Sequence, residues 1–187
     1  MLSLEQARHI LHKHVSQPHL LIHALAVSSA MGALAAHFGA DADYWRAIGY
    51  LHDVDYEKYP DEHLRHAEEI LRAEQVDAAD IRAVLSHGWG LCSEVEPLNE
   101  LEKCLYAVDE LTGIVMAAAL MRPQGIADLE VKSLMKKFKD KSFAARCDRE
   151  VIRAGCEILG MELSQLMALT IEGMRGEMDA LGLDPKE

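Results

Sequence analysis

The chain is organised around the stretch Gly49-Tyr50-Leu51-His52-Asp53-Val54-Asp55, which sets a histidine beside an aspartate at the close of an apolar segment. Successive residues inside an α-helix point about 100° apart, so His52 and Asp53 converge on one atom only where a helix ends and the backbone turns. An imidazole nitrogen and a carboxylate oxygen offered together suit a first-row divalent metal ion better than they suit an apolar core. A lone His-Asp pair is common by chance, so the rest of the chain decides whether this pair has partners.

The composition predicts a single all-α domain. The chain has 187 residues, half of them apolar and only 5% aromatic, a length that fits one domain with a proper core. Alanine, leucine, methionine and glutamate dominate and favour helices, whereas the alternating β-branched runs typical of a sheet are missing. We expect a helical core over residues 1–122 and additional C-terminal helices over residues 123–187, packed on the same domain.

The charge and the cysteines restrict partners and location. A formal net charge of −12 disfavours binding to duplex nucleic acid, because that affinity comes mostly from lysines and arginines that neutralise phosphates. The N-terminus lacks a basic region followed by an apolar signal core, and we expect no uncharged run of membrane-spanning length. We therefore expect a cytoplasmic protein without a membrane partner, with four reduced cysteines that form no Cys-x-x-Cys pair. The sequence does not decide between a monomer and a homodimer.

The histidines confine imidazole chemistry to the first half of the chain, because all ten lie between His9 and His87. His23 lies in the apolar stripe of a helix predicted over residues 19–38, where a histidine is more often a satisfied core residue than a ligand. His63 and His66 are three apart on a helix predicted over residues 61–74 and can share one face. His87 ends a further predicted helix. The helical patterns before residue 122 cover residues 3–14, 19–38, 41–51, 61–74, 78–87 and 97–121.

Asp109 continues the apolar stripe of the longest helical pattern, residues 97–121. An ionised carboxylate buried without a partner is strongly unfavourable, so this side chain needs a cation. The sequence leaves two partners open, an arginine and a metal ion.

Residues 132–153 reverse the acidic character of the chain, with eight Lys or Arg against three Asp or Glu. One interpretation is a solvated helix face. The other is a phosphate-facing lip on an active site.

Taken in order, these residues resemble the HD-domain superfamily of metal-dependent phosphohydrolases, whose signature is a histidine, then His-Asp, then a distant aspartate. The resemblance covers roughly residues 17–121. Its segments are Ile22-His23-Ala24-Leu25-Ala26-Val27, Gly49-Tyr50-Leu51-His52-Asp53 and Ala107-Val108-Asp109-Glu110-Leu111. His66 and His87 are similar to the additional ligands of the dinuclear branch. The continuation Val54-Asp55-Tyr56-Glu57-Lys58 differs from the Gly-Lys of cyclic-dinucleotide phosphodiesterases, which disfavours that subclass.

The resemblance implies an HD-domain-like helical bundle that holds one or two divalent ions, with Fe, Mn, Co, Ni and Zn all compatible with mixed nitrogen and oxygen ligands. The ligands of one ion would be His23, His52, Asp53 and Asp109. A second ion would bind His66 and His87, with Asp53 bridging. His63 in place of His66 is an open alternative, because a shift of three residues keeps roughly the same helix face.

The implied activity is hydrolysis of a nucleotide or other small phosphate ester by metal-activated water. Asp53 and Lys58 are the expected catalytic residues, with Lys58 or a lysine of the basic segment steadying the leaving phosphate. Two other functions stay open on the same ligand set. One is a di-iron oxygenase, and the other is a non-catalytic nucleotide-sensing module in which the metals hold the helices together.

Overall fold

The structure, a computed structural model, describes residues 1–186, and this part of the chain forms ten α-helices and one short 3-10 helix without a β-strand. The all-α prediction is therefore confirmed. In chain order the elements are α1 (Leu4–His14), α2 (Pro18–Phe38), α3 (Ala42–Leu51), η1 (Pro60–Glu62), α4 (Ala67–Ala73), α5 (Ala78–Ser86), α6 (Glu100–Leu120), α7 (Val131–Lys139), α8 (Arg149–Leu159), α9 (Leu163–Arg175) and α10 (Met178–Leu181).

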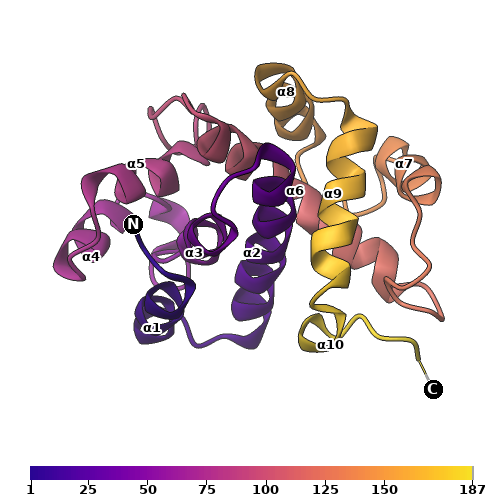
Figure 1. Cartoon of the computed structure of the whole chain (residues 1–187), viewed down its shortest axis with the longest axis horizontal. Coiled ribbons are helices and arrows are strands. Elements are labelled where there is room, and N and C mark those ends of the chain that lie inside the picture. Colours follow the sequence, from indigo (N-terminus) through magenta and orange to yellow (C-terminus); the bar gives the residue numbers. More distant parts are fainter. Residues whose placement is uncertain (187) are drawn as a thin grey trace.

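Helix α2 forms the centre of the molecule. Figure 1 shows α1, α3, α4 and α5 on one side of it and α7 to α10 on the other. It packs against α3, α6 and α9, and Val27, Ala30 and Met31 are fully buried in these contacts. A helix that is apolar around most of its circumference can be surrounded by others in this way.

The expectation that no segment approaches membrane-spanning length is wrong for α2. Its 21 residues include no Asp, Glu, Lys or Arg, and by length and composition the helix could cross a membrane. Half of its most apolar window is buried by the rest of the chain. The core helix of a soluble protein passes the same test, so this property is weak evidence for a membrane span.

Helix α6 connects the N-terminal helices to the C-terminal ones. It contacts α2 and α5 on one side and α7, α8 and α9 on the other. Leu105, Leu111 and Ile114 are fully buried there. The segment after residue 122 therefore packs directly on the helix that carries Asp109.

Residues 61–74 do not form the single helix that the sequence predicts. The 3-10 helix η1 is followed by a turn in which Leu64 has a φ of +67°, and α4 begins only at Ala67, with His66 as its N-cap. A left-handed residue cannot continue a right-handed helix, so the chain changes direction between His63 and His66. The two histidines consequently point in different directions.

Candidate metal centre

Six histidine and aspartate side chains from distant parts of the sequence form one cluster. His23 lies in the first half of α2, and His52 is the C-cap of α3. The backbone turns directly after His52, so the adjacent Asp53 can face the same point. Asp109 comes from the middle of α6. His87, the C-cap of α5, and His63, in the turn before α4, complete the group.

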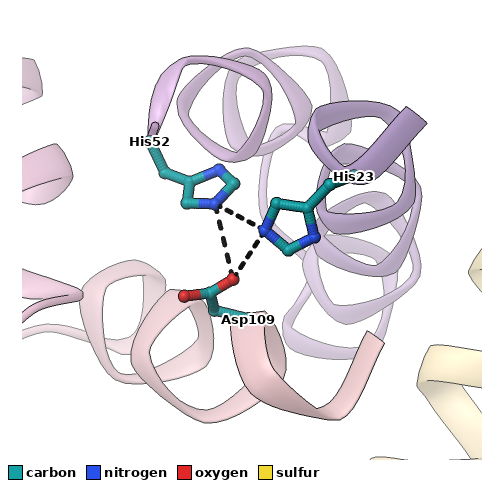
Figure 2. A group of neighbouring side chains, drawn as sticks. All are labelled: His23, His52 and Asp109. Atoms are coloured by element: carbon teal, nitrogen blue, oxygen red, sulfur yellow. Dashed lines mark hydrogen bonds and ion pairs between the residues drawn. The ribbon is translucent and has the colours of Figure 1, made fainter. Parts of the chain in front are cut away.

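One half of the group consists of His23, His52 and Asp109, shown in Figure 2. The Nε2 atoms of His23 and His52 are 3.1 Å apart. Asp109 Oδ1 lies 3.0 Å from His23 Nε2 and 3.4 Å from His52 Nε2. Asp53 Oδ2 closes this half, at 3.2 Å from His52 Nε2 and 3.5 Å from His23 Nε2.

The other half is built on the second oxygen of Asp53. Asp53 Oδ1 lies 3.2 Å from His63 Nε2 and 3.6 Å from His87 Nε2. These two imidazole nitrogens are 3.1 Å apart. The carboxylate of Asp53 therefore faces two pairs of histidines, one with each oxygen.

The spacing of these atoms fits metal coordination. Ligand atoms about 2.1 Å from a common ion are separated by about 3.0 Å at a right angle and about 3.4 Å at a tetrahedral angle. The separations given above run from 3.0 to 3.6 Å. Each half can thus surround one cation without rearrangement of the backbone.

The outward nitrogens of three histidines show which ring atom faces the cluster. His52 Nδ1 lies 2.8 Å from the Gly49 carbonyl oxygen, and His87 Nδ1 lies 2.7 Å from the Val84 carbonyl oxygen. A carbonyl oxygen only accepts, so each Nδ1 must carry the hydrogen, and the Nε2 lone pair of the neutral ring points inward. His63 Nδ1 is held in the same way, 2.9 Å from Asp55 Oδ1. The Nε2 lone pairs of His63 and His87 face each other at 3.1 Å and repel unless a proton or a metal ion lies between them.

The pKa shifts of the clustered histidines and aspartates also indicate a site for positive charge. Burial would lower the pKa of His52, but Asp53 and Asp109 outweigh burial and raise that pKa well above its ordinary value. Burial would raise the pKa of both carboxyls, yet His52 and its neighbours hold both pKa values well below the usual range. Asp53 and Asp55 likewise overcome the burial of His63 and raise its pKa to about 9. Without metal the cluster attracts protons, so it is a site that stabilises positive charge.

Two residues expected at the site lie elsewhere. His66 points away from the cluster, where its ring stacks on Tyr59 and its Nε2 lies 3.2 Å from Glu62 Oε2. His63 takes the position expected of His66, because the left-handed residue between them rotates the chain. Lys58 is exposed and its Nζ lies 3.3 Å from His14 Nδ1, outside the pocket over the cluster.

Asp55 is a residue of this site that the sequence interpretation missed. Its side chain is fully buried, and its two oxygens face His63 Nδ1 and the backbone N–H of His66. The one signal in the sequence was its position two residues after Asp53. A buried carboxylate that pairs with no arginine or lysine must accept hydrogen bonds from other polar groups.

A pocket of about 350 Å³ lies over the cluster. Five residues of the cluster line it, namely His23, Asp53, His63, His87 and Asp109. Its remaining lining comes from residues outside the cluster, namely Leu20, Tyr56, Gly88, Leu91, Cys92, Glu110, Gly113, Arg146, Cys147 and Val151. The pocket thus offers apolar side chains to the organic part of a small molecule beside the cluster of histidines and aspartates.

Residues 20–114, about half of the chain, match the family model described as HD domain. A search of curated proteins and a search of solved structures gave no match. All six converging residues fall inside the matched range, whereas the segment that contributes Arg146 and Cys147 to the pocket lies beyond it.

Proposed function

The chain belongs to the HD domain family, and from that premise we propose that it is a metal-dependent phosphohydrolase acting on a nucleotide or another small phosphate ester. The HD superfamily consists mostly of metal-dependent hydrolases. One observation carries the proposal for this chain: the two oxygens of Asp53 face two separate pairs of imidazoles, as a carboxylate between two cations must.

In this proposal His23, His52, Asp109 and Asp53 Oδ2 hold one ion, and His63, His87 and Asp53 Oδ1 hold the other. This assignment replaces His66 with His63. Two divalent ions would carry four positive charges against the three carboxylates of Asp53, Asp55 and Asp109, and the positive surplus favours a phosphate as the bound group. When bound, the ions would lower the pKa of a coordinated water and neutralise charge on the phosphoryl oxygens.

The residues of the chain prepare this chemistry in two ways. His52, His63 and His87 keep their Nδ1 hydrogens on outward acceptors, so their Nε2 atoms stay oriented before a ligand arrives. The carboxylate of Asp53 would be shared by both ions, one at each oxygen, and this is its proposed catalytic role.

The size and walls of the pocket support a small substrate. Ligand sites usually measure about 300–1,000 Å³, and 350 Å³ lies at the low end of that range. Leu20, Leu91 and Val151 give the pocket an apolar wall, and Tyr56 adds an aromatic ring. This lining suits the organic part of a phosphate ester, such as a nucleoside, better than a polymer.

The test compares His52→Ala and Asp53→Asn with His37→Ala, a control that removes an exposed histidine far from the cluster. Metal content is measured by plasma mass spectrometry, and phosphate release is measured over a panel of nucleotides and sugar phosphates with Mn²⁺, Fe²⁺, Co²⁺, Ni²⁺ or Zn²⁺. We expect the two site variants to lose metal and turnover and the control to keep both.

Three results would contradict the proposal in different ways. Unchanged metal content and turnover in both site variants would remove the assignment of the site. Oxygen consumption by the iron-loaded protein without phosphate release would favour an oxygenase on the same ligands. Metal and nucleotide binding without turnover on any member of the panel would favour a non-catalytic binding module.

A further inference from the structure

The segment of residues 140–148, between α7 and α8, is held by a buried arginine. Arg149 is 7% exposed, and its guanidinium donates to the backbone carbonyl oxygens of five residues. The acceptors are Phe138, Asp140, Phe143, Ala144 and Cys147, the first at 2.8 Å from Nε. A guanidinium has five N–H donors, and each has an acceptor here: four in this segment and one, Phe138, near the end of α7. The backbone of residues 140–148 is therefore fixed in one conformation around the side chain of Arg149.

Two contacts fix the same segment against α6, beside Asp109. The backbone N–H of Asp148 donates to Glu110 Oε2 at 3.0 Å. Gly113 leaves room for Cys147, because a Cβ at Gly113 would lie 2.7 Å from the Cys147 sulfur. The segment consequently sits at the edge of the metal centre and contributes Arg146 and Cys147 to the lining of the pocket.

Arg146 is the one Lys or Arg among the residues that line this pocket in the described chain. Its side chain is exposed and makes no hydrogen bond or ion pair within residues 1–186. Two nearby cations are engaged instead, and Lys141, which makes no such bond within residues 1–186 either, does not line the pocket. Arg153 pairs with Glu150, and Lys137 lies 4.7 Å from the centre of the Phe143 ring. A fixed backbone thus presents a free guanidinium to a pocket whose other polar groups are imidazoles and carboxylates.

We propose that Arg146 is a substrate-binding residue that donates two hydrogen bonds to the phosphate group of the ligand, from the part of the pocket lining that the segment between α7 and α8 contributes. The inference rests on the proposed function for the choice of phosphate. A planar guanidinium matches a tetrahedral oxyanion through two parallel N–H···O bonds, which a lysine cannot reproduce. In a chain with a net charge of −12, this cation also offsets the repulsion that an incoming anion meets.

The basic stretch 132–153 had two interpretations, a solvated helix face and a phosphate-facing lip, and this inference assigns the second to a single residue. Arg149 is buried and structural, Arg153 and Lys137 are engaged with neighbouring side chains, and only Arg146 lines the pocket. The phosphate-facing lip is therefore one residue rather than a basic surface. It lies outside the HD match, so this substrate contact comes from the C-terminal helices.

The experiment titrates inorganic phosphate into the full chain loaded with Mn²⁺ and follows the heat of binding. The variants are Arg146→Ala and Arg146→Lys, and the control is Lys141→Ala, which removes the same charge from the same segment outside the pocket lining. We expect Arg146→Ala to weaken phosphate binding by about 10- to 100-fold, the usual effect of hydrogen bonds to a charged group. Arg146→Lys should recover part of this loss, and Lys141→Ala should bind as the unmodified chain does.

Metal content and thermal unfolding of each variant separate a binding role from a structural one. Because Arg146 makes no bond within the described fold, both should be unchanged in Arg146→Ala. With p-nitrophenyl phosphate as substrate, the KM should rise by the same factor as the phosphate dissociation constant while kcat changes less.

Three outcomes would overturn the inference. They are unchanged phosphate affinity in Arg146→Ala, an equal loss in Lys141→Ala, and no phosphate binding by the metal-loaded unmodified chain. The result also separates the two proposals. Phosphate binding that depends on Arg146 without any turnover keeps this inference and removes the hydrolase, whereas turnover that is insensitive to Arg146→Ala does the reverse.

Discussion

Asp55→Asn should weaken the binding of one of the two proposed metal ions and leave the binding of the other unchanged. Asp55 Oδ1 accepts the Nδ1 hydrogen of His63 at 2.9 Å, and Oδ2 accepts the backbone N–H of His66 at 3.3 Å. An asparagine has the same shape but only one acceptor oxygen, so one of these two donors must face an NH₂ group. Either His63 loses the partner that orients its ring, or the N-terminus of α4 loses its acceptor.

The magnitude follows from the kind of contact that is lost. Removing the outer partner of a metal-binding histidine typically lowers metal affinity by about 10- to 100-fold. The carboxylate is fully buried, so the unsatisfied donor should also lower the free energy of unfolding of the metal-free protein by about 1–3 kcal/mol. Only the half of the centre built on His63 and His87 should be affected, because Asp55 makes no contact with His23 or Asp109 within residues 1–186.

The assay is a competitive metal titration that resolves two binding steps. Asp80→Asn is the matched control, since Asp80 is also a buried carboxylate, 3% exposed, that accepts a hydrogen bond from Tyr44 Oη at 2.7 Å. The amide oxygen of an asparagine can still accept from Tyr44 Oη, so this variant should keep both ions. If Asp55→Asn binds both ions as tightly as the unmodified protein, or loses both equally, then the assignment of His63 to a separate second ion is refuted.

Three further results are expected. His63→Ala should reduce the bound metal measured by plasma mass spectrometry, and His66→Ala should leave it unchanged, because only His63 faces the cluster; equal loss in both would contradict the assignment. Arg149→Lys should lower the free energy of unfolding, measured in urea, by about 2–5 kcal/mol. The ammonium group of a lysine has three N–H donors, so at least two of the five carbonyl oxygens that Arg149 binds would lose their partner, and an unchanged unfolding midpoint would contradict this prediction. In the metal-free protein the pKa of His63 is raised to about 9, so below that pH a cation must displace a proton; apparent metal affinity should rise with pH and level off above about 9, whereas a flat profile would exclude the competition.

The sequence predicted the parts of this molecule that depend on pattern. The apolar periodicity of residues 97–121 located α6 within a few residues and placed Asp109 on its inward side. The apolar run before His52 located the end of α3, and with it the turn that brings His52 and Asp53 together. Both follow from the period of a helix and from what ends one, and both can be read from local residue types.

The features that were missed depend on single backbone angles and on distant contacts. Leu64 adopts a φ of +67° although it is neither glycine nor asparagine, so nothing in its residue type announces the break that exchanges His63 for His66. The role of Arg149 depends on five carbonyls that turn towards it only in the folded chain. An arginine in a basic stretch is interpreted as a surface charge, because the sequence does not show which guanidinium donates its hydrogen bonds to backbone carbonyl oxygens.

The position of His52 beside His23 originates in the packing of α3 on α2. A Cβ at Gly49 would lie 2.9 Å from Met31 Cγ and 3.1 Å from Ser28 Cα, so only glycine allows α3 this close to α2. The carbonyl of the same glycine fixes Nδ1 of His52, three residues later. Gly49 therefore sets both the distance of His52 from the helix that carries His23 and the direction of its ring. The turn after His52 then lets Asp53 reach His63 and His87 with its other oxygen, so a short stretch at the end of one helix positions both halves of the centre.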